Sequence, residues 1–343
     1  MIIDANIYWM PDQIFSDPAL LEQFLSCVPV EHGARAHVNE ISGTNKKQIV
    51  IEKPVGYQNL NYVERQYSLE AQLRDLDEAG VDLAILKLPG CQEWLSLELC
   101  RKFNDWMAAH VQASNGRLKG LAVVPPWGTK DCLIELERCV HELGMSGAQL
   151  SAHYGDLYLD DEVFRPLLRQ LNDLDIPAYI HHAPLPVQYD TLLDYNNLRR
   201  SYGRCADQVI AVAREIFSGI FAEFPNLKFV HSMLGGAFFS YVDQMFPQKS
   251  RTKEELDRFN LDKDYREYLR NNVFFEISNI TWGKAQLECA VKVLGADKII
   301  FGSSYPVRRE WLLYGPQFVR ELDISAEEQS LLLGENARRI YNI

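Results

Sequence analysis

Short apolar segments alternate along the chain with longer segments in which apolar residues recur at helical spacing. Each short segment is apolar on both faces, which is typical of a strand in a parallel sheet. Eight such strands are predicted, at Ile2–Tyr8, Val81–Leu88, Leu118–Val124, Gly147–Ser151, Pro177–His181, Leu227–His231, Val273–Ser278 and Lys298–Ser303. The pattern therefore indicates repeated strand–helix units.

The segments between the strands carry the start and stop signals of helices. Ser68 precedes a stretch with leucine at positions 69, 73 and 76, and Gly80 follows it. Helices are also expected over 131–143, which Gly144 stops, and over 161–174 and 206–224, each of which a proline closes off. Eight strand–helix units favour a (β/α)8 TIM barrel, and an open doubly wound sheet is the alternative.

A long segment, residues 9–67, breaks the alternation after the first strand and is rich in Pro, Gly, Asn and Gln. Connections of this length are usually functional, so we expect an insertion or lid over the carboxyl end of the barrel. The charge-rich segment 244–271 is expected to be a helical excursion on the same side. The whole chain, 1–343, is otherwise predicted to form a single barrel domain.

Composition narrows the functional classes. The 343 residues are 47% hydrophobic, and 47 acidic against 35 basic side chains give a formal charge of -12, which disfavours nucleic-acid binding. No apolar run approaches the roughly 20 residues that span a bilayer, and no basic region precedes an apolar stretch at the N-terminus. The seven cysteines are scattered and lack a C-x-x-C pair, as in reduced cytosolic proteins. We therefore expect a cytoplasmic protein.

Polar residues gather at the predicted carboxyl ends of the strands, where barrel enzymes place their active sites. Three of the eight histidines lie at two neighbouring strand ends, and His231 is followed by the glycine pair 235–236. The residues that stand out are Asn6, Tyr8, Lys87, His181, His182, His231, Glu276 and Ser304, with Arg308 just beyond the eighth strand.

Several motifs resemble one family in both order and spacing. They are Ile3–Ala5, Leu76–Asp82, Ser151–Phe164, Ile176–His181, His231–Phe238, Phe301–Pro306 and Gly334–Arg339. The chain resembles the amidohydrolase-related family that includes aminocarboxymuconate-semialdehyde decarboxylase and the resorcylate and carboxyvanillate decarboxylases. The resemblance covers almost the whole chain and implies a TIM barrel, commonly dimeric, that acts on a small molecule.

The resemblance also implies a metal site, which this chain does not preserve. The family takes two ligands from a His-x-His on the first strand, a histidine from the fifth and an aspartate from the eighth. Here Asn6 and Tyr8 replace the first pair and Ser304 replaces the aspartate, whereas His181 matches the fifth-strand ligand. Since a catalytic zinc needs about three protein ligands, we predict that no metal is bound, with zinc as the alternative.

The resemblance and the residues together suggest an enzyme that uses acid–base chemistry without a metal. His231 matches the family's catalytic acid or base, and His181 with Glu276 is expected to orient or shuttle the proton. Asn6 and Tyr8 are expected to stabilise developing oxyanion charge. His182, Lys87, Arg308 and Ser304 complete the expected substrate-binding set. The reaction is decarboxylation, or hydrolysis or isomerisation of a lactone-like bond, on a small carboxylated or carbonyl substrate.

Two other hypotheses remain open from the sequence. In one, the barrel has lost catalysis and binds a small molecule or a partner protein, as the three replaced ligands would suggest. In the other, the protein is a metal-dependent hydrolase whose site has moved to His181, His182, His231 and Glu276, a ligand set that suits zinc. A homodimer is expected in each case, because barrels of this resemblance commonly dimerise.

Overall fold

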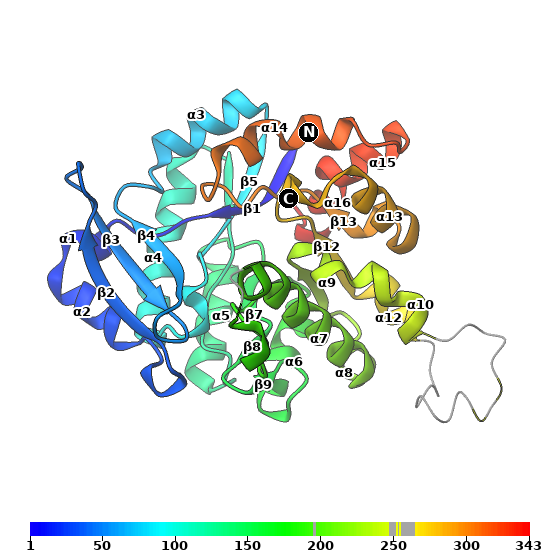
Figure 1. Cartoon of the computed structure of the whole chain (residues 1–343), viewed down its shortest axis with the longest axis horizontal. Coiled ribbons are helices and arrows are strands. Elements are labelled where there is room, and N and C mark those ends of the chain that lie inside the picture. The colour runs from blue at the N-terminus through cyan, green and yellow to red at the C-terminus, as the bar shows by residue number, and fades with distance from the viewer. Residues whose placement is uncertain (195–196, 247–251, 253, 255–264) are drawn as a thin grey trace.

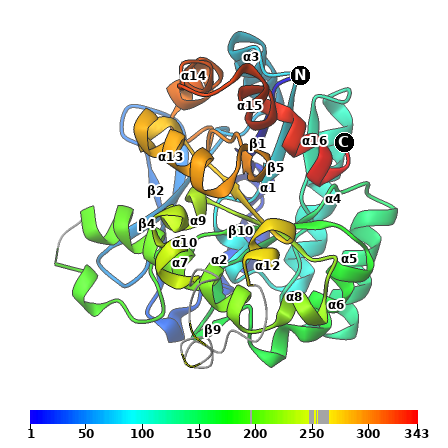
Figure 2. The ribbon, with the colours of Figure 1, turned by 90° about the vertical axis from the view of Figure 1, so that its right-hand side faces the viewer.

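The computed structural model describes residues 1–194, 197–246, 252, 254 and 265–343 (Figure 1). Its centre is a ring of eight parallel strands, and helices lie around the outside of that ring (Figure 2). The strands are β1 (Ile3–Tyr8), β5 (Leu83–Lys87), β6 (Leu118–Gly120), β7 (Ala148–Ser151), β10 (Pro177–His181), β11 (Lys228–His231), β12 (Val273–Glu276) and β13 (Ile299–Ile300). Each of the eight predicted strands is present.

The strands form a closed barrel rather than an open sheet. They pair in two parallel ladders, in the orders β1-β5-β6 and β13-β12-β11-β10-β7. Parallel bridges between Ile7 and Tyr305 and between Ala122 and Ala148 join the ladders at both seams. The predicted TIM barrel is therefore confirmed, and the doubly wound alternative is wrong.

The expected helices form where the sequence signals place them. Helix α3 (Leu69–Ala79) begins at Ser68, whose hydroxyl accepts the amide of Ala71, and ends at Gly80 with a φ of 66°. The next expected helices are α5 (Lys130–His141), α6 (Arg165–Asp173), α7 (Gly203–Phe217) and α8 (Ile220–Glu223). The outer layer is completed by α4 (Leu97–Ala113), α13 (Lys284–Leu294), α14 (Arg309–Arg320), α15 (Ala326–Ser330) and α16 (Asn336–Tyr341).

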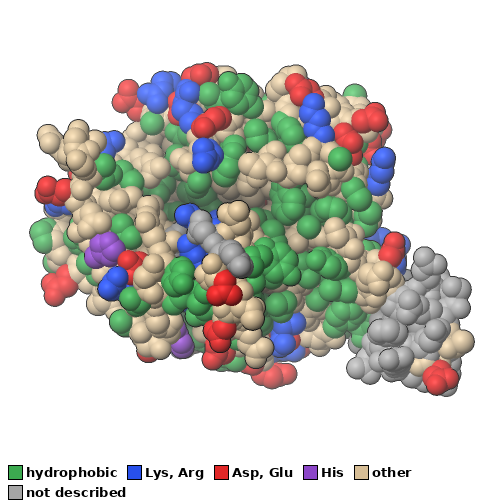
Figure 3. Space-filling model, viewed as in Figure 1, with side chains coloured by type: hydrophobic (Ala, Val, Ile, Leu, Met, Phe, Trp, Pro, Cys, Tyr) green, Lys and Arg blue, Asp and Glu red, His purple; other side chains and the backbone are tan. Residues whose placement is uncertain are grey.

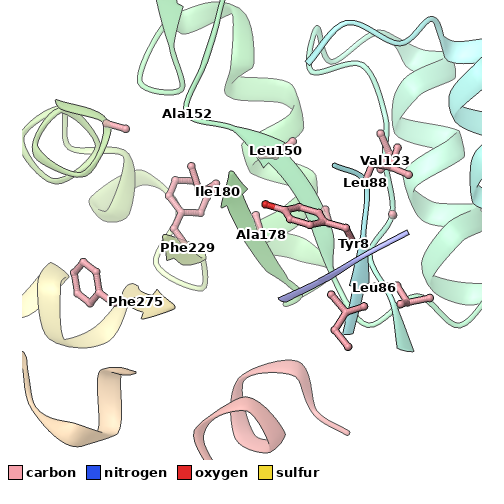
Figure 4. Close-up of a cluster of buried hydrophobic side chains, with 14 of the residues drawn as sticks. Tyr8, Leu86, Leu88, Val123, Leu150, Ala152, Ala178, Ile180, Phe229 and Phe275 are labelled. Atoms are coloured by element: carbon pink, nitrogen blue, oxygen red, sulfur yellow. The ribbon is translucent and has the colours of Figure 1, made fainter. Parts of the chain in front are cut away.

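Alternate strand residues build two separate cores. One set points into the barrel and packs with Ile340 and Tyr341 of α16, which covers the amino-terminal end. This inner set is Ile3, Ala5, Ile85, Leu121, Tyr179, Val230, Phe274 and Ile300. The opposite faces belong to a larger cluster that includes Leu86, Ile180 and Phe229 (Figure 4). With its amino end filled by apolar side chains, the barrel is open to a ligand at its carboxyl end.

The insertion has a fold of its own. It contains α1 (Gln13–Ser16), α2 (Pro18–Ser26) and an antiparallel sheet of β2 (Arg35–Glu40), β3 (Lys47–Glu52) and β4 (Gln58–Val63). In Figure 1 this sheet, in blue, stands beside the barrel. The predicted excursion at 244–271 lies largely outside the described residues, and α12 (Tyr265–Asn271) is its described end.

The backbone after β11 adopts an uncommon conformation. All five residues of α9 (Met233–Ala237) have positive φ angles, between 50° and 70°. A left-handed conformation costs about 1–2 kcal/mol for each residue other than glycine. Two further non-glycine residues at the same end of the barrel, Ser278 and Ser304, have φ angles of 61° and 58°. Strained backbone therefore gathers at the carboxyl end, where functional sites often store it.

Gly236 allows this left-handed turn to contact α7, and its replacement tests that contact. A Cβ atom at Gly236 would lie 1.9 Å from the carbonyl oxygen of Cys205, whereas one at Gly80, which has a similar φ, would meet nothing within 4 Å. We expect Gly80→Ala to lower the free energy of unfolding by about 1–2 kcal/mol through strain alone. Gly236→Ala should cost at least twice as much, measured by urea denaturation. Equal losses in the two variants would show that the contact does not constrain the turn.

Candidate functional site

A pocket of about 400 Å³ opens at the carboxyl end of the barrel. Strand ends and the loops after them provide one part of its wall, and the insertion sheet provides another through Gln48, Gln58, Leu60 and Tyr62. The face drawn in Figure 3 is hollowed near its centre, and Lys and Arg side chains lie beside the hollow. Of the residues predicted from the sequence, the pocket is lined by Tyr8, His181, His182 and Ser304.

Tyr8 and His181 form a hydrogen-bonded pair on the pocket wall. Tyr8 Oη lies 3.0 Å from His181 Nε2, and His181 Nδ1 lies 2.8 Å from the carbonyl oxygen of His182. Because a carbonyl only accepts, the geometry assigns the ring proton to Nδ1, and Nε2 accepts from the tyrosine hydroxyl. Burial, with the nearby charge of Lys87, holds the pKa of His181 well below its usual value. The imidazole is therefore neutral, and the phenol is its donor.

Glu276 lies beneath this pair, fully buried. Its Oε2 accepts from Asn6 Nδ2 at 2.9 Å, from Tyr179 Oη at 2.7 Å and from Ser278 Oγ at 3.0 Å. Burial raises the pKa of Glu276, while Lys87 and the hydrogen bonds from Tyr179 and Ser278 oppose the rise. Asn6 also donates to Ser304 Oγ at 3.0 Å. Neither Asn6 nor Glu276 lines the pocket. Both side chains therefore support residues of the pocket wall and do not face a ligand directly.

Lys87 is fully buried behind Tyr8 and does not line the pocket, contrary to its expected place in the binding set. Its Nζ lies 4.2 Å from the ring centroids of both Tyr8 and Tyr179. Among the described residues it has no hydrogen-bond partner. Burial lowers its pKa to about 7, although the charges of Glu276 and Asp4 oppose the change. Two aromatic faces thus take the place of hydrogen-bond acceptors around this ammonium group.

The structure corrects the expected position of His231. Val230 points into the barrel, so His231 points outward, toward α7. Its Nδ1 lies 3.0 Å from Gln208 Oε1 and its Nε2 lies 2.7 Å from Glu215 Oε2, and the side chain is fully buried. Both ring nitrogens are therefore engaged away from the pocket, and His231 is not placed to protonate a ligand there.

Arg308 also lies outside the pocket. Its side chain is 62% exposed and faces Glu310 at 3.9 Å. Arg200 and Arg204 line the pocket instead, in a π-helical turn (Leu198–Tyr202) and at the start of α7. Neither residue was predicted from the sequence. The available signal was a cluster of arginines after the fifth strand, and its position relative to the pocket depends on the fold.

A buried histidine and aspartate hold α7 in place next to Arg204. Both nitrogens of His153 face carbonyl oxygens, with Nδ1 2.8 Å from Gly155 O and Nε2 2.9 Å from Leu185 O. Asp207, on α7, lies 3.6 Å from Nε2 and accepts the amide of Ala183 at 2.9 Å. This pair fixes the helix against the segment that follows β10.

Comparison with known proteins agrees with the fold. Residues 90–343 match the family model Amidohydro_2, described as amidohydrolase, so the chain belongs to the amidohydrolase family. It is 26% identical over 276 residues to 2-amino-3-carboxymuconate-6-semialdehyde decarboxylase of Dictyostelium discoideum, a match that covers 78% of this chain and 75% of the relative. It is 24% identical over 290 residues to gamma-resorcylate decarboxylase of a Polaromonas species, covering 80% and 87%.

Solved structures agree with this assignment. The 5-carboxyvanillate decarboxylase of Sphingomonas paucimobilis is 27% identical, with a TM-score of 0.71 over 80% of this chain and 82% of that one. The manganese-bound enzyme of the same name from Novosphingobium aromaticivorans is 25% identical, with a TM-score of 0.69 over 82% and 83%. The predicted family is confirmed, as is the expectation of an enzyme of the amidohydrolase-related hydrolase or carboxy-lyase class.

The prediction that no metal takes part is contradicted by these neighbours. The decarboxylases of N. aromaticivorans and Polaromonas were crystallised with bound manganese. The side chains of this chain nevertheless do not match such a site, because His181 stands with Asn6, Tyr8 and Ser304. No group of three or more His, Cys, Asp or Glu in the described ranges is arranged to hold a metal ion. The relocated set that included His231 and Glu276 is therefore not assembled among the described residues.

Within the ranges described, no helix has the length and apolar character needed to cross a bilayer. The cytoplasmic location and the homodimer expected from the sequence stay predictions.

The buried ammonium of Lys87 predicts a characteristic pH dependence of stability. With a pKa of about 7 in the folded chain against 10.5 normally, the lysine is protonated only in the unfolded chain between these values. That protonation stabilises the unfolded state, and the stabilisation decreases as the pH rises toward 10.5, so the folded state becomes relatively more stable. Relative to Lys87→Met, the wild-type free energy of unfolding should therefore rise between pH 7 and 10 by about 1.4 kcal/mol per pH unit. Urea denaturation of both proteins across this range measures it.

The matched control is Lys292→Met, which removes an exposed lysine. Its difference from wild type should not vary with pH. If the Lys87→Met difference is equally constant, the ammonium is not held at a depressed pKa.

Proposed function

We propose that this protein is a carboxy-lyase that releases CO2 from a small hydroxylated aromatic acid. The observation that carries the proposal is the hydrogen bond from Tyr8 to His181 at 3.0 Å, inside a pocket that Arg204 also lines. A proton donor and a carboxylate-binding cation are the two groups that this reaction needs. The relatives named above as decarboxylases of carboxylated substrates support the same class.

Arg204 is the group we assign to the substrate carboxylate. A guanidinium presents paired donors that match a carboxylate, and its charge persists even though burial lowers the pKa of Arg204. Among the described residues no hydrogen-bond partner reaches its buried Nε. Ser304, on the same wall, already donates to the carbonyl oxygen of Ser278 at 2.6 Å and accepts from Asn6, so we assign it a structural role.

Tyr8 is the acid in this scheme. Burial raises the pKa of its hydroxyl, so the group carries its proton at neutral pH. The hydroxyl first turns its proton from His181 Nε2 toward the ring carbon bearing the carboxylate. As the O–H bond breaks, a C–H bond forms at that carbon. The C–CO2 bond then breaks, its electron pair returns to the ring, and CO2 leaves. Lys87 Nζ lies 4.2 Å from the centroid of the Tyr8 ring, and the negative charge of the tyrosinate that remains favours the protonated form of this amine.

His181 completes the cycle. Its neutral Nε2 holds the Tyr8 hydroxyl in position before the reaction. After CO2 leaves, a proton from solvent restores the phenol, and the imidazole orients the hydroxyl for the next turnover. The net change is the replacement of a carboxylate by a hydrogen, with one proton taken from water. General acid catalysis of this kind is worth about 10²–10⁴-fold in rate.

Turnover of hydroxylated aromatic acids tests the proposal directly. The full chain, with and without added manganese, is incubated with 2,6-dihydroxybenzoate and 5-carboxyvanillate, and CO2 release and substrate loss are followed. We expect Tyr8→Phe to lower kcat by about 10²–10⁴-fold because the acid is lost. Arg204→Gln should act mainly through KM, by about tenfold or more, because it removes a ground-state contact. Product formed in D2O should carry deuterium at the former carboxyl position.

The control is Arg320→Gln, which removes an exposed arginine of α14 outside the pocket and should keep wild-type kinetics. An unchanged kcat in Tyr8→Phe would remove the tyrosine as acid. If the wild type binds these acids but turns none over, the binding-only hypothesis replaces the carboxy-lyase.

A further inference from the structure

Two arginines share one wall of the pocket. Arg200 and Arg204 are four residues apart in the continuous helical segment formed by Leu198–Tyr202 and α7. Both line the pocket, so their side chains follow one another along the same helical face. Arg204 is partly buried and lies close enough to Tyr8 and His181 to affect their pKa values, whereas Arg200 is exposed.

Within the described ranges, neither of these arginines forms an ion pair or a side-chain hydrogen bond. Other arginines of the chain do: Arg138 binds Glu135 at 2.8 Å and Arg214 binds Asp160 at 2.7 Å. The chain carries 47 acidic side chains, so a lack of carboxylates does not explain the difference. Glu93, which shares a small adjoining recess with Arg204, is bound to Lys53 at 2.6 Å. The pocket therefore concentrates positive charge in an acidic protein.

The remainder of the wall does not neutralise this charge. The insertion sheet contributes the uncharged amides Gln48, Gln58 and Asn61, and no acidic side chain lines the described pocket. Arg204 Nε is buried without an acceptor in the described structure, and such a group indicates a ligand that provides one. A pocket of about 400 Å³ suits a compound with a single ring.

We propose that Arg200 is a specificity residue that binds a second carboxylate, so that the substrate is an aromatic dicarboxylate rather than a simple benzoate. This inference rests on the proposed function for the identity of the first carboxylate, which Arg204 holds beside Tyr8 and which is lost. Arg200, nearer the solvent, holds the carboxylate that stays on the product. The bound substrate then spans the wall along the helix, with one anionic group at each arginine.

Binding of unreactive acids tests this assignment without any turnover. Isothermal titration calorimetry measures benzoate, isophthalate and terephthalate binding to the wild type and to Arg200→Gln, Arg204→Gln and Arg320→Gln. We expect the better of the two dicarboxylates to bind the wild type at least tenfold more tightly than benzoate. Arg200→Gln should remove this preference and leave benzoate affinity unchanged, whereas Arg204→Gln should weaken all three acids.

Arg320→Gln makes the same charge change outside the pocket and should keep the wild-type preference. A wild type that binds benzoate as tightly as both dicarboxylates would overturn the inference. So would an Arg200→Gln variant that keeps the full preference while its unfolding midpoint matches the wild type.

The binding experiment tests the second subsite and the turnover experiment tests the reaction, so either proposal can be wrong while the other stands. If the dicarboxylate preference depends on Arg200 but no aromatic acid is decarboxylated, the subsite stands and the proposed reaction is wrong. If monocarboxylic acids are decarboxylated and Arg200→Gln leaves both KM and the binding preference unchanged, the reaction stands and the second subsite is wrong.

Discussion

The carboxylate of Glu276 organises the carboxyl end of this barrel. A buried carboxylate is unfavourable unless hydrogen bonds replace its water, and Asn6, Tyr179 and Ser278 supply them from three different segments. Ser278 in turn receives the amide of Met233, and Asn6 extends the network to Ser304. The negative charge also offsets part of the cost of burying Lys87. One side chain thereby links the strand ends next to Tyr8.

The barrel was predictable because its signals are local. Each strand is a compact apolar run, and the helix over 69–79 carries a serine at its start and a glycine at its end. The direction of His231 was not predictable, since a strand buried on both faces has no polar face to reveal its orientation. Within the insertion, the apolar run Ile49–Ile51 of β3 is short and bordered by polar residues, and the composition of the surrounding segment concealed the sheet.

The site could be predicted only in part, because its residues meet through the fold. Tyr8 and His181 were expected from their strand ends and do form a pair. Arg200 and Arg204 come from a helix whose position over the pocket depends on long-range packing, including the contact of Asp207 with Ala183. The metal prediction relied on replaced ligand positions, and the manganese-bound neighbours contradict it.

The left-handed turn after β11 restricts which pocket residues can be substituted during evolution. Met233 contributes to the pocket from a backbone conformation that β-branched side chains tolerate poorly, and Gly236 behind it is held against α7. Few amino acids are acceptable on that side, so we expect natural variation there to be narrow. The pocket-lining positions Gln48, Gln58 and Asn61 lie on the extended strands β3 and β4 outside the buried core, and they tolerate a wider range of side chains. New substrate preferences in descendants of this sequence should therefore arise by exchange of residues on the insertion.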